Sequence, residues 1–422
     1  MDKKILIISN EPISNTSSNG RTLRNFLLDI PKEQIAQFFL HGTPDEQSVS
    51  SFYQVSDNDA LNALLMRKPK AKKTQQTKQN VTTTSTVAPK KIRRNCKTMV
   101  LRDLVWRSYA WWKKDFDKFI KDFNPDVLLF QAGDAPFMFA ITLKIAKKYK
   151  LPIVMYNSEN YVLKKTIYSL SKDDRGWHKI LHNSLKRIYK KLMKKVSFCI
   201  YSTEYLEKQY QKAYPHEDKS CALYTVSELS PLQDNSDNER FNLLYCGNLG
   251  VGRVIPLDEI AKTLYEVDKT ATLDIYGAFA SERGKKYVCK NPNVRYGGVV
   301  PYEQVKQLMS EASMLIHTEN AERIEHIKCA FSTKIADSLA SGRPFLVYAS
   351  NEYPFVEYLK QNNCAHIACN SDELKDILQK CITDKNYCTQ YEINAIKTAQ
   401  MNHDVQKNCI RMIGIFDKIK RL

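Results

Sequence analysis

The stretch NPDVLLFQAGDAPFMFAITLKIAKKYKLPIVMY, residues 124–156, contains two short apolar runs separated by a segment of helix length. Asp126–Phe130 and Leu151–Tyr156 have the length and composition of buried strands, and Pro136–Tyr149 between them predicts a helix. A strand, a crossing helix and a second strand form a βαβ unit, in which the two strands are parallel. The sequence therefore predicts an α/β protein with a parallel sheet.

The same alternation extends along most of the chain. Lys4–Asn10 and Ile35–Leu40 read as buried strands, and Arg21–Asp29 between them has helical spacing of its apolar residues. A second alternation follows the polar segment Glu228–Arg240. Its expected strands are Asn242–Cys246, Ala271–Tyr276, Val294–Tyr296, Met314–His317 and Pro344–Tyr348, and its expected helices are Leu257–Asp268, Tyr302–Ser310, Thr333–Ala340, Pro354–Gln361 and Val405–Lys420.

These patterns predict two domains. We expect a first domain at residues 1–227, a linker at 228–240, a second domain at 241–402 and a C-terminal helix at 403–422 that packs back on the first domain. Both domains are expected to be doubly wound and Rossmann-like. Ligands bind at the carboxyl ends of parallel strands, so both sets of loops should face a central cleft.

Two segments of the first domain need separate interpretation. Residues 43–97 lose the pattern and include the polar run KTQQTKQNVTTTS at 73–85, so we expect a mobile insertion there. The aromatic residues from Trp106 to Phe119 recur mostly at three- and four-residue steps with lysines between them. This spacing predicts an amphipathic helix that either packs on the sheet or lies against a membrane, and core packing is the favoured use.

The composition excludes several classes of protein. With 422 residues, 43% of them hydrophobic and 10% aromatic, the chain is too apolar to be disordered. Its longest apolar runs, such as Val127–Phe130, fall far short of the about 18 residues that a membrane-spanning helix requires. The N-terminus begins with charged residues and does not resemble an export signal. We expect a cytoplasmic protein.

The net charge of +18 is unevenly distributed. Residues 1–240 contain 41 Lys and Arg against 25 Asp and Glu, a net charge of +16, whereas the remainder has a net charge of +2. Within the first part the basic residues concentrate between Arg67 and Lys195. A basic face can meet nucleic acid, anionic lipid or a phosphorylated substrate, and solvated helix faces are the simpler alternative.

The 11 cysteines are odd in number and scattered, and several lie in apolar segments, where a thiol behaves as a small hydrophobic group. Cys364 and Cys369 are five residues apart, Cys381 and Cys388 are seven apart, and His366 is nearby. This spacing is looser than that of the cysteine pairs in structural zinc sites. We therefore expect no metal site.

A glycine-rich loop in the second domain is suited to an anionic ligand. Tyr245–Arg253 (YCGNLGVGR) places Gly247, Gly250 and Gly252 directly after a predicted strand. Glycines let the backbone approach a ligand closely, and Arg253 is placed to meet an anion. A plain tight turn is an equally good interpretation of the loop by itself.

A second stretch, Phe331–Pro344 (FSTKIADSLASGRP), predicts a helix that begins at Ser332 or Thr333. The free N–H groups and positive dipole end of such a helix suit a phosphate, and Lys334 adds a full charge. Asp337, one turn further along, could hold a ribose diol. The alternative is an ordinary capped helix with a solvated Asp337.

As a set, these motifs resemble those of bacterial nucleotide-sugar glycosyltransferases of the GT-B fold, in particular glycosyltransferase family 4. The resemblance covers most of residues 242–350 and is looser over residues 1–227. It implies transfer of a sugar from a nucleoside diphosphate sugar to an acceptor, with retention at the anomeric carbon and without a bound metal or other cofactor. The matching stretches are Leu243–Arg253, Leu273–Gly277, Gly297–Val305, His317–Glu319 and Phe331–Pro344, with Gly20, Asn124–Phe130 and Tyr156–Tyr161 in the first domain.

The resemblance also implies roles for individual residues. Arg253 would neutralise the diphosphate, the helix end with Lys334 would bind phosphate, Asp337 would bind the ribose, and the base would lie against the loop containing Val300. Without a metal, such groups stabilise the leaving diphosphate. The donor-binding candidates are Gly20, Gly247, Asn248, Gly250, Arg253, Tyr276, Val300, Glu319, Ser332, Thr333, Lys334 and Asp337.

The sequence departs from the family pattern at three positions. Cys329 stands where the family commonly has a Glu that touches the donor sugar, and Glu259 where it often has a second phosphate-binding Lys. After the strand that ends at residue 156, the family often has a His, whereas Glu159 follows here. We interpret this as a divergent branch in which Glu319, Lys334 and Glu159 take over these roles. The catalytic candidates are Glu159, Arg253 and Lys334.

Two functions are consistent with these features. The first is a glycosyltransferase that uses a UDP- or GDP-sugar and a glycan acceptor, lipid-linked, in the assembly of a bacterial surface polysaccharide. Its basic first domain would dock on the anionic inner face of the membrane. The second is an inactive transferase-like protein that binds nucleic acid or an acidic partner. No nucleic-acid-binding signature occurs in the sequence, so we expect no nucleic-acid partner.

Overall fold

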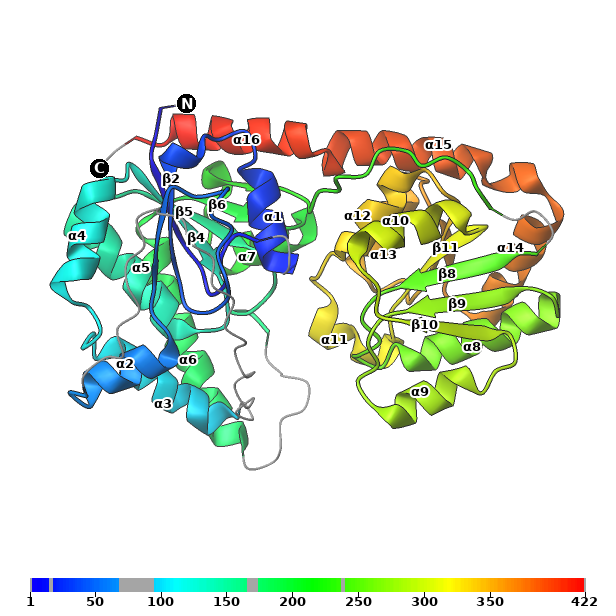
Figure 1. The fold of residues 1–422 in the computed structure, drawn as a ribbon, viewed down its shortest axis with the longest axis horizontal. Coiled ribbons are helices and arrows are strands. Elements are labelled where there is room, and N and C mark those ends of the chain that lie inside the picture. Colours follow the sequence, from blue (N-terminus) through cyan, green and yellow to red (C-terminus); the bar gives the residue numbers. More distant parts are fainter. Residues whose placement is uncertain (1, 15–17, 68–94, 165–173, 237–239, 421–422) are drawn as a thin grey trace, which may run out of the picture. The chain divides into compact units, whose positions relative to one another are not determined.

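The structure is a computed structural model, and it describes residues 2–14, 18–67, 95–164, 174–236 and 240–420. The chain forms two compact units, Met1–Leu223 together with Cys409–Leu422, and Tyr224–Asn408. Each unit is built around one parallel β-sheet with helices packed around it (Figure 1). The prediction of two doubly wound α/β domains is confirmed.

The first unit contains a seven-stranded sheet in the order β3-β2-β1-β4-β5-β6-β7. The strand order reverses between β1 and β4, so the carboxyl ends of these two strands flank a crevice suited to a ligand. The strands are β1 (Ile5–Ile8), β2 (Ile35–Phe39), β3 (Ser51–Gln54), β4 (Val127–Ala132), β5 (Ile153–Asn157), β6 (Val196–Tyr201) and β7 (Ser220–Ala222). The helices are α1 (Ser18–Phe26), α2 (Asp57–Leu64), α3 (Cys96–Arg107), α4 (Lys114–Phe123), α5 (Pro136–Tyr149), α6 (Arg175–Met193) and α7 (Glu204–Ala213).

The centre of this sheet explains why its strands read as continuous apolar runs. In β1, Ile5 pairs with Ile35 on one side and with Val127 on the other. All residues of β1, β2 and β4 are buried, because helices cover both faces of a parallel sheet. The βαβ unit β4–α5–β5 lies where the sequence predicts it.

The structure corrects the expected insertion at residues 43–97. Strand β3 and helix α2 form within it, and β3 extends the sheet by pairing with β2. The sequence hides β3 because it is a half-buried edge strand of four residues. Residues 68–94 of the predicted insertion lie outside the described part of the chain.

The aromatic segment forms two helices, α3 and α4, where the sequence predicts one. The break follows Arg107 and contains Tyr109 in the left-handed region, with φ of 55°. Trp106, Trp111 and Phe116 are all buried, and Trp111 stacks on Phe38 of the sheet. Their use in core packing is confirmed.

The second unit contains a six-stranded sheet in the order β10-β9-β8-β11-β12-β13. Its strand order reverses between β8 and β11, which places a second crevice at the carboxyl ends of those strands. The strands are β8 (Asn242–Cys246), β9 (Thr272–Tyr276), β10 (Val294–Gly298), β11 (Met314–Thr318), β12 (Phe345–Tyr348) and β13 (His366–Ala368). The helices are α8 (Val254–Val267), α9 (Glu282–Cys289), α10 (Tyr302–Glu311), α11 (Ile324–Ile327), α12 (Thr333–Ser341), α13 (Pro354–Gln361), α14 (Ser371–Thr383) and α15 (Thr389–Thr398). Helix α16 (Val405–Lys418) begins in the second unit and continues into the first.

The polar segment expected to be a linker at 228–240 packs along the second unit over residues 228–236. The Leu232 N–H donates to the Ser341 carbonyl at 2.9 Å, and the Asn235 N–H to the Ser310 carbonyl at 2.9 Å. Asp234 also forms an ion pair with Arg343 at 2.6 Å. The chain divides at 223/224 instead, and it returns to the first unit at Cys409, within α16.

The C-terminal end of α16 contacts the N-terminal strand region. The Lys3 ammonium donates to the backbone carbonyls of Phe416, at 2.6 Å, and of Asp417 and Ile419. These contacts lie within the first unit. Across the described ranges, every helix is too short or too polar to cross a bilayer.

Candidate functional site

The glycine-rich loop follows β8 at the crevice of the second unit. Its Gly247 N–H donates to the Tyr276 carbonyl at 2.7 Å, which ties the loop to the end of β9. Gly277 there has φ of +145°, and a Cβ on it would lie 1.8 Å from the Gly247 carbonyl oxygen. Only glycine fits this close approach of two backbones. Val251 and Gly252, with φ of 56° and 77°, turn the chain into α8.

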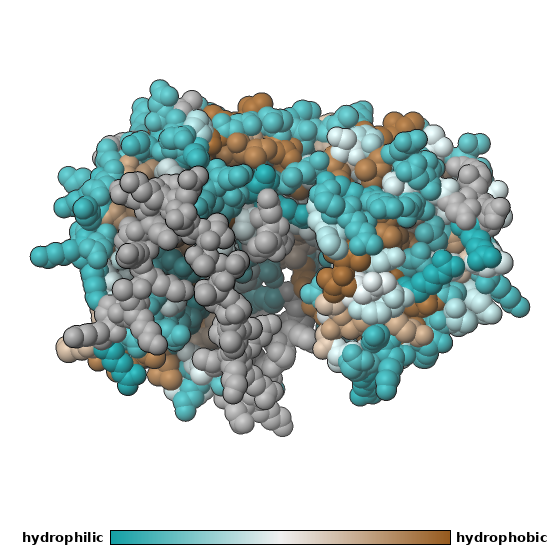
Figure 2. Space-filling model, in the orientation of Figure 1, coloured by the Kyte–Doolittle hydropathy of each residue, from teal (hydrophilic) through white to brown (hydrophobic). Residues whose placement is uncertain are grey.

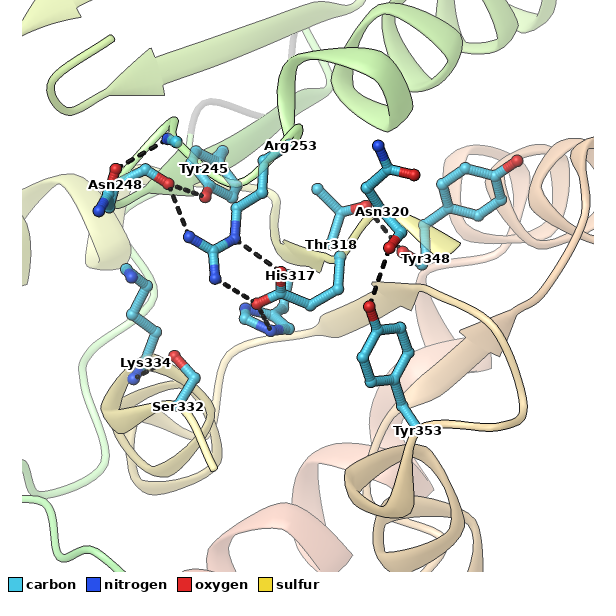
Figure 3. A network of polar contacts seen from close by, with 12 residues as sticks. Tyr245, Asn248, Arg253, His317, Thr318, Asn320, Ser332, Lys334, Tyr348 and Tyr353 are labelled. Carbon is cyan, nitrogen blue, oxygen red and sulfur yellow. Dashed lines mark hydrogen bonds and ion pairs between the residues drawn. The ribbon is translucent and has the colours of Figure 1, made fainter. Parts of the chain in front are cut away.

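Arg253 is the N-cap residue of α8, and its side chain points toward the end of β11 (Figure 3). Its Nε and Nη2 atoms donate to the two carboxylate oxygens of Glu319, at 2.8 and 2.5 Å. Its Nη1 donates to the Asn248 carbonyl at 3.1 Å. The loop after β8 and the end of β11 are therefore joined by a bidentate ion pair, a geometry specific to arginine.

Glu319 is the buried anion of this pair. His317 Nε2 lies 3.5 Å from its carboxylate, and both side chains are nearly inaccessible. Burial by itself would raise the pKa of Glu319, but the hydrogen bonds and positive charge of Arg253 help to outweigh it, and the pKa lies below its usual value. Burial lowers the pKa of His317, so the imidazole stays neutral near pH 7. Glu319 is thus a fixed negative charge that holds Arg253 in place.

Lys334 supplies a second cation from the first turn of α12. The Ser332 hydroxyl caps this helix by accepting from the Lys334 N–H at 3.3 Å. The Lys334 side chain extends toward the glycine-rich loop (Figure 3). A Cβ on Gly247 would lie 2.1 Å from Lys334 Cε, so the absence of a side chain at 247 makes room for the lysine. Burial lowers the pKa of Lys334, and the charge of Arg253 lowers it further.

The two cations differ in how their charge is balanced. Arg253 is matched by Glu319. Over the described part of the chain, by contrast, no carboxylate lies within ion-pair distance of the Lys334 ammonium. The cluster therefore carries one uncompensated positive charge beside the N-terminus of a nine-residue helix. Such a combination attracts an anion, and a phosphate group fits it best.

The remaining candidates of the second unit lie around this cluster or beside it. Asn248 is in the loop, with its Oδ1 accepting from the Gly250 N–H at 2.8 Å. The Asp337 carboxylate is buried and accepts from the hydroxyls of Ser227, at 2.6 Å, and Tyr302, at 3.2 Å. Thr333 is the first residue of α12, Tyr276 ends β9, and Val300 follows β10 as a half-buried residue.

Glu259 and Cys329, two of the residues that depart from the family pattern, lie outside the cluster of Arg253, Glu319 and Lys334. Glu259, where a lysine is common in the family, accepts from the Ser371 hydroxyl at 2.5 Å and does not take part in the cluster. Lys334 is the lysine that the structure places against the loop instead. Cys329 lies in the half-buried segment just before α12.

Glu159 and Gly20 belong to the first unit. Glu159 follows β5, and its carboxylate lies 3.7 Å from the Lys164 ammonium. Burial raises the pKa of Glu159, while Lys164 and Tyr161 oppose the shift. Gly20 is buried within α1.

The crevice of the first unit holds a site that sequence reasoning missed. A cavity of about 220 Å³ opens at the carboxyl ends of β1, β4 and β5. Asn10 and Gln131 line it, and their Oδ1 and Nε2 atoms are buried without a hydrogen-bond partner among the described residues. Buried polar atoms are nearly always paired, so these two point to a polar ligand. The reversal of strand order could have located this site, but only once the neighbours of β1 were known. Other lining residues are Glu11, Arg102, Asp134, Ser158 and Tyr161.

Comparison with known proteins gives matches by structure alone. No family model matches the sequence, and no curated protein matches it. HepE from Anabaena, in complex with UDP, superposes with a TM-score of 0.64 at 13% identity, over 99% of this chain and 100% of that one. Sucrose-phosphate synthase from Thermosynechococcus elongatus gives 0.63 at 10% identity, over 99% and 98%. WaaG, a glycosyltransferase involved in lipopolysaccharide biosynthesis, gives 0.57 at 13% identity, over 97% and 100%. The chain has the GT-B glycosyltransferase fold.

Proposed function

We propose that the protein is a glycosyltransferase that transfers a sugar from a nucleoside diphosphate sugar to a hydroxyl group of a glycan acceptor. The observation that carries the proposal is the uncompensated Lys334 ammonium beside the Arg253–Glu319 pair, at the crevice of the second sheet. As the sugar–phosphate bond breaks, negative charge develops on the departing diphosphate. Preplaced cations and helix-end N–H groups stabilise that charge without reorganisation.

The nucleotide of the donor is proposed to be UDP. In support, HepE binds UDP and UDP-glucose in structures that share this fold, and TarM has been solved with UDP. Retention at the anomeric carbon and independence of a metal remain part of the proposal, in line with the family resemblance. The second unit supplies cations of its own where a metal would otherwise balance the diphosphate.

The acceptor is proposed to bind in the cavity of the first unit. Asn10 and Gln131 line this cavity, and each has an unpaired buried amide atom that can form a hydrogen bond with a sugar hydroxyl. Asp134 and Glu11 line the same cavity and offer carboxylates. Glu159, with its raised pKa, is the candidate for proton transfer at this end. A hydroxyl-rich glycan satisfies these groups better than an apolar ligand.

We further propose that the acceptor is lipid-linked and that the first unit docks on a membrane through a surface formed by α2, α3 and α6. These helices pack side by side (Figure 1). The α2–α3–α6 surface exposes a group of large apolar side chains, and Figure 2 shows hydrophobic colouring over the α2–α3 region. The group consists of Leu61, Leu64, Leu65, Met66, Leu101, Leu104, Trp177 and Ile180.

Basic residues accompany these apolar side chains. Arg67, Lys97, Lys179 and Lys190 lie on or next to the same three helices. Exposed apolar side chains together with Lys and Arg are the composition of interfacial membrane-binding surfaces. On this proposal, the excess of basic residues in 1–240 serves to attract the protein to an anionic membrane.

The proposed activity is tested by measuring release of nucleoside diphosphate from a panel of UDP- and GDP-sugars, with and without glycan acceptors. The variant Lys334→Ala is expected to lower kcat/KM by about 100- to 1,000-fold, the usual cost of removing one transition-state hydrogen-bond donor. Lys375→Ala is the matched control, because Lys375 is a lysine of the same unit that pairs with Glu266 on the surface. Equal turnover by the wild type and Lys334→Ala would overturn the proposed donor site.

A further inference from the structure

Three side chains with soft donor atoms meet in the second unit, outside the cluster around Arg253. His366 begins the edge strand β13, Cys381 lies in the last turn of α14, and Cys388 ends the short turn Lys385–Cys388 that follows. Their ligand atoms all lie within 4.8 Å of one another. The residues are 2%, 8% and 5% exposed, so the group is closed off from bulk water.

The imidazole of His366 is incompletely satisfied. Its Nε2 atom is buried and has no hydrogen-bond partner among the residues that the structure describes. The ring is held by Tyr387 and Tyr391, whose centroids lie 4.9 and 4.0 Å from its own. A buried polar atom left unpaired costs about 1–3 kcal/mol, so a fixed ring with an unused nitrogen indicates a missing partner.

The separation of the two sulfur atoms fits a shared metal ion. Cys381 Sγ and Cys388 Sγ lie 3.6 Å apart, and both residues are free thiols. Two thiolates on one tetrahedral zinc ion, each at about 2.3 Å from the metal, are separated by about 3.8 Å, and a thiolate and an imidazole nitrogen by about 3.5 Å. The observed group can therefore close on a zinc ion with small side-chain movements.

We propose that His366, Cys381 and Cys388 bind a zinc ion. On binding, both thiols release their protons, so the two thiolates balance the charge of Zn²⁺ and the neutral imidazole donates the lone pair of Nε2. The ion fastens the end of α14 and the following turn to the edge strand β13. Its role is to stabilise this part of the second unit, and it takes no part in sugar transfer.

The sequence alone argued against this site because the spacing is unusual. Between His366 and Cys381 lies nearly the whole of α14, and the two cysteines are seven residues apart. Zinc sites that are recognisable from sequence usually contain cysteine pairs two to four residues apart. Here the fold, through the edge position of β13, brings the histidine to the cysteines.

The test measures zinc in the full-length protein, purified under reducing conditions, by mass spectrometry of the metal. We expect about one zinc per chain, and Co²⁺ added to the zinc-free protein should give thiolate-to-cobalt charge-transfer absorption. Cys388→Ser and His366→Ala should lose both signals. The matched control is Cys364→Ser, because Cys364 is a buried cysteine of the same unit outside the group, and it should keep both.

Two results would overturn the zinc site. One is reduced wild-type protein that contains no zinc and gives no cobalt absorption, a measurement that does not depend on any variant folding. The other is a Cys381–Cys388 disulfide in protein prepared without reductant, with no zinc bound after reduction. Nucleotide-sugar turnover by the same samples reports separately on the proposed function, so failure of one does not imply failure of the other.

Discussion

The two units share a doubly wound parallel sheet but use charge in different ways. The first unit has 44 Lys and Arg against 22 Asp and Glu, a net charge of +22, yet its crevice is lined by amides, hydroxyls and acidic groups as well as by Arg102. The second unit has 20 against 24, a net charge of −4, yet its crevice holds Arg253 and Lys334. Net charge therefore does not locate the chemistry. The chemistry is located by the position of each charge and by its burial.

Both crevices arise in the same way, where the order of strands reverses between β1 and β4 and between β8 and β11. The first offers unpaired amide atoms, which suit hydroxyl groups. The second offers cations, which suit phosphate. The same topology thus presents two different ligand chemistries, because only the loops after the strands differ.

The largest expected effect concerns the buried ion pair between Arg253 and Glu319. Arg253→Met should lower the free energy of unfolding by about 3–5 kcal/mol, since it leaves the Glu319 carboxylate buried without its partner. Urea denaturation measures this change. The double variant Arg253→Met/Glu319→Gln should recover most of the loss. Arg283→Met on the exposed face of α9 is the control, and an equal loss there would mean that the pair has no special role.

A second prediction concerns a buried histidine of the second unit. His403 donates from Nδ1 to the Thr225 carbonyl at 2.7 Å, and the Tyr358 hydroxyl lies 3.0 Å from its Nε2. Burial lowers the pKa of His403 to about 4, against an unfolded value of about 6.5. Its contribution to stability is complete above about pH 6.5 and is lost as the pH falls through 4, by about 3 kcal/mol in total.

Denaturation curves at several pH values test this prediction. The wild type should lose about 3 kcal/mol more stability than His403→Gln between pH 7 and pH 4, because glutamine does not titrate. Parallel pH profiles for the two proteins would show that His403 is not held neutral by the fold.

The third prediction tests the α2–α3–α6 surface of the first unit. Replacing Leu101 and Leu104 by serine removes two exposed apolar side chains and should weaken binding to vesicles of anionic lipid by about tenfold. High salt should weaken it further, since basic residues near an anionic surface contribute about 1 kcal/mol each. Ile393→Ser, at an equally exposed position in the second unit, should leave co-sedimentation unchanged. Equal binding by all three proteins would exclude this surface as the docking site.

The smallest expected effect concerns the room that Gly247 leaves for Lys334. Gly247→Ala should displace the lysine and lower nucleotide affinity by about tenfold, with little change in stability, because the clash involves the flexible end of a side chain. In a Lys334→Ala background the same substitution should have no further effect. Additive losses in the double variant, measured by calorimetry, would show that Gly247 acts independently of Lys334.

The sequence predicts most of the sheet architecture because buried parallel strands are continuous apolar runs. It fails at β3, β7 and β13, which are edge strands of four, three and three residues. It also misses the helix break at Tyr109, because a left-handed residue within an aromatic run has no sequence signature. Local pattern is thus informative where burial is complete and weak at the edges.

The sequence motifs identified Arg253, Lys334 and Glu319 as candidate site residues. They did not show which of these residues are in contact. The ion pair joins residues 66 positions apart, and the neighbourhood of Gly247 and Lys334 depends on β8 lying next to β11. The cavity around Asn10 and the group at His366 are likewise found only once the pairing of distant segments is known. Pairing of distant segments is a property of the sheet, which a single sequence does not specify.

The most direct test compares the affinities of UDP and uridine, by isothermal titration calorimetry, for the wild type and Lys334→Ala. If the second crevice binds a diphosphate through its cations, UDP should bind the variant at least about tenfold more weakly, the cost of a charge-assisted hydrogen bond, while the affinity for uridine stays the same. Lys375→Ala should behave as the wild type for both ligands. Unchanged UDP affinity in Lys334→Ala would contradict the assignment of this crevice to the diphosphate.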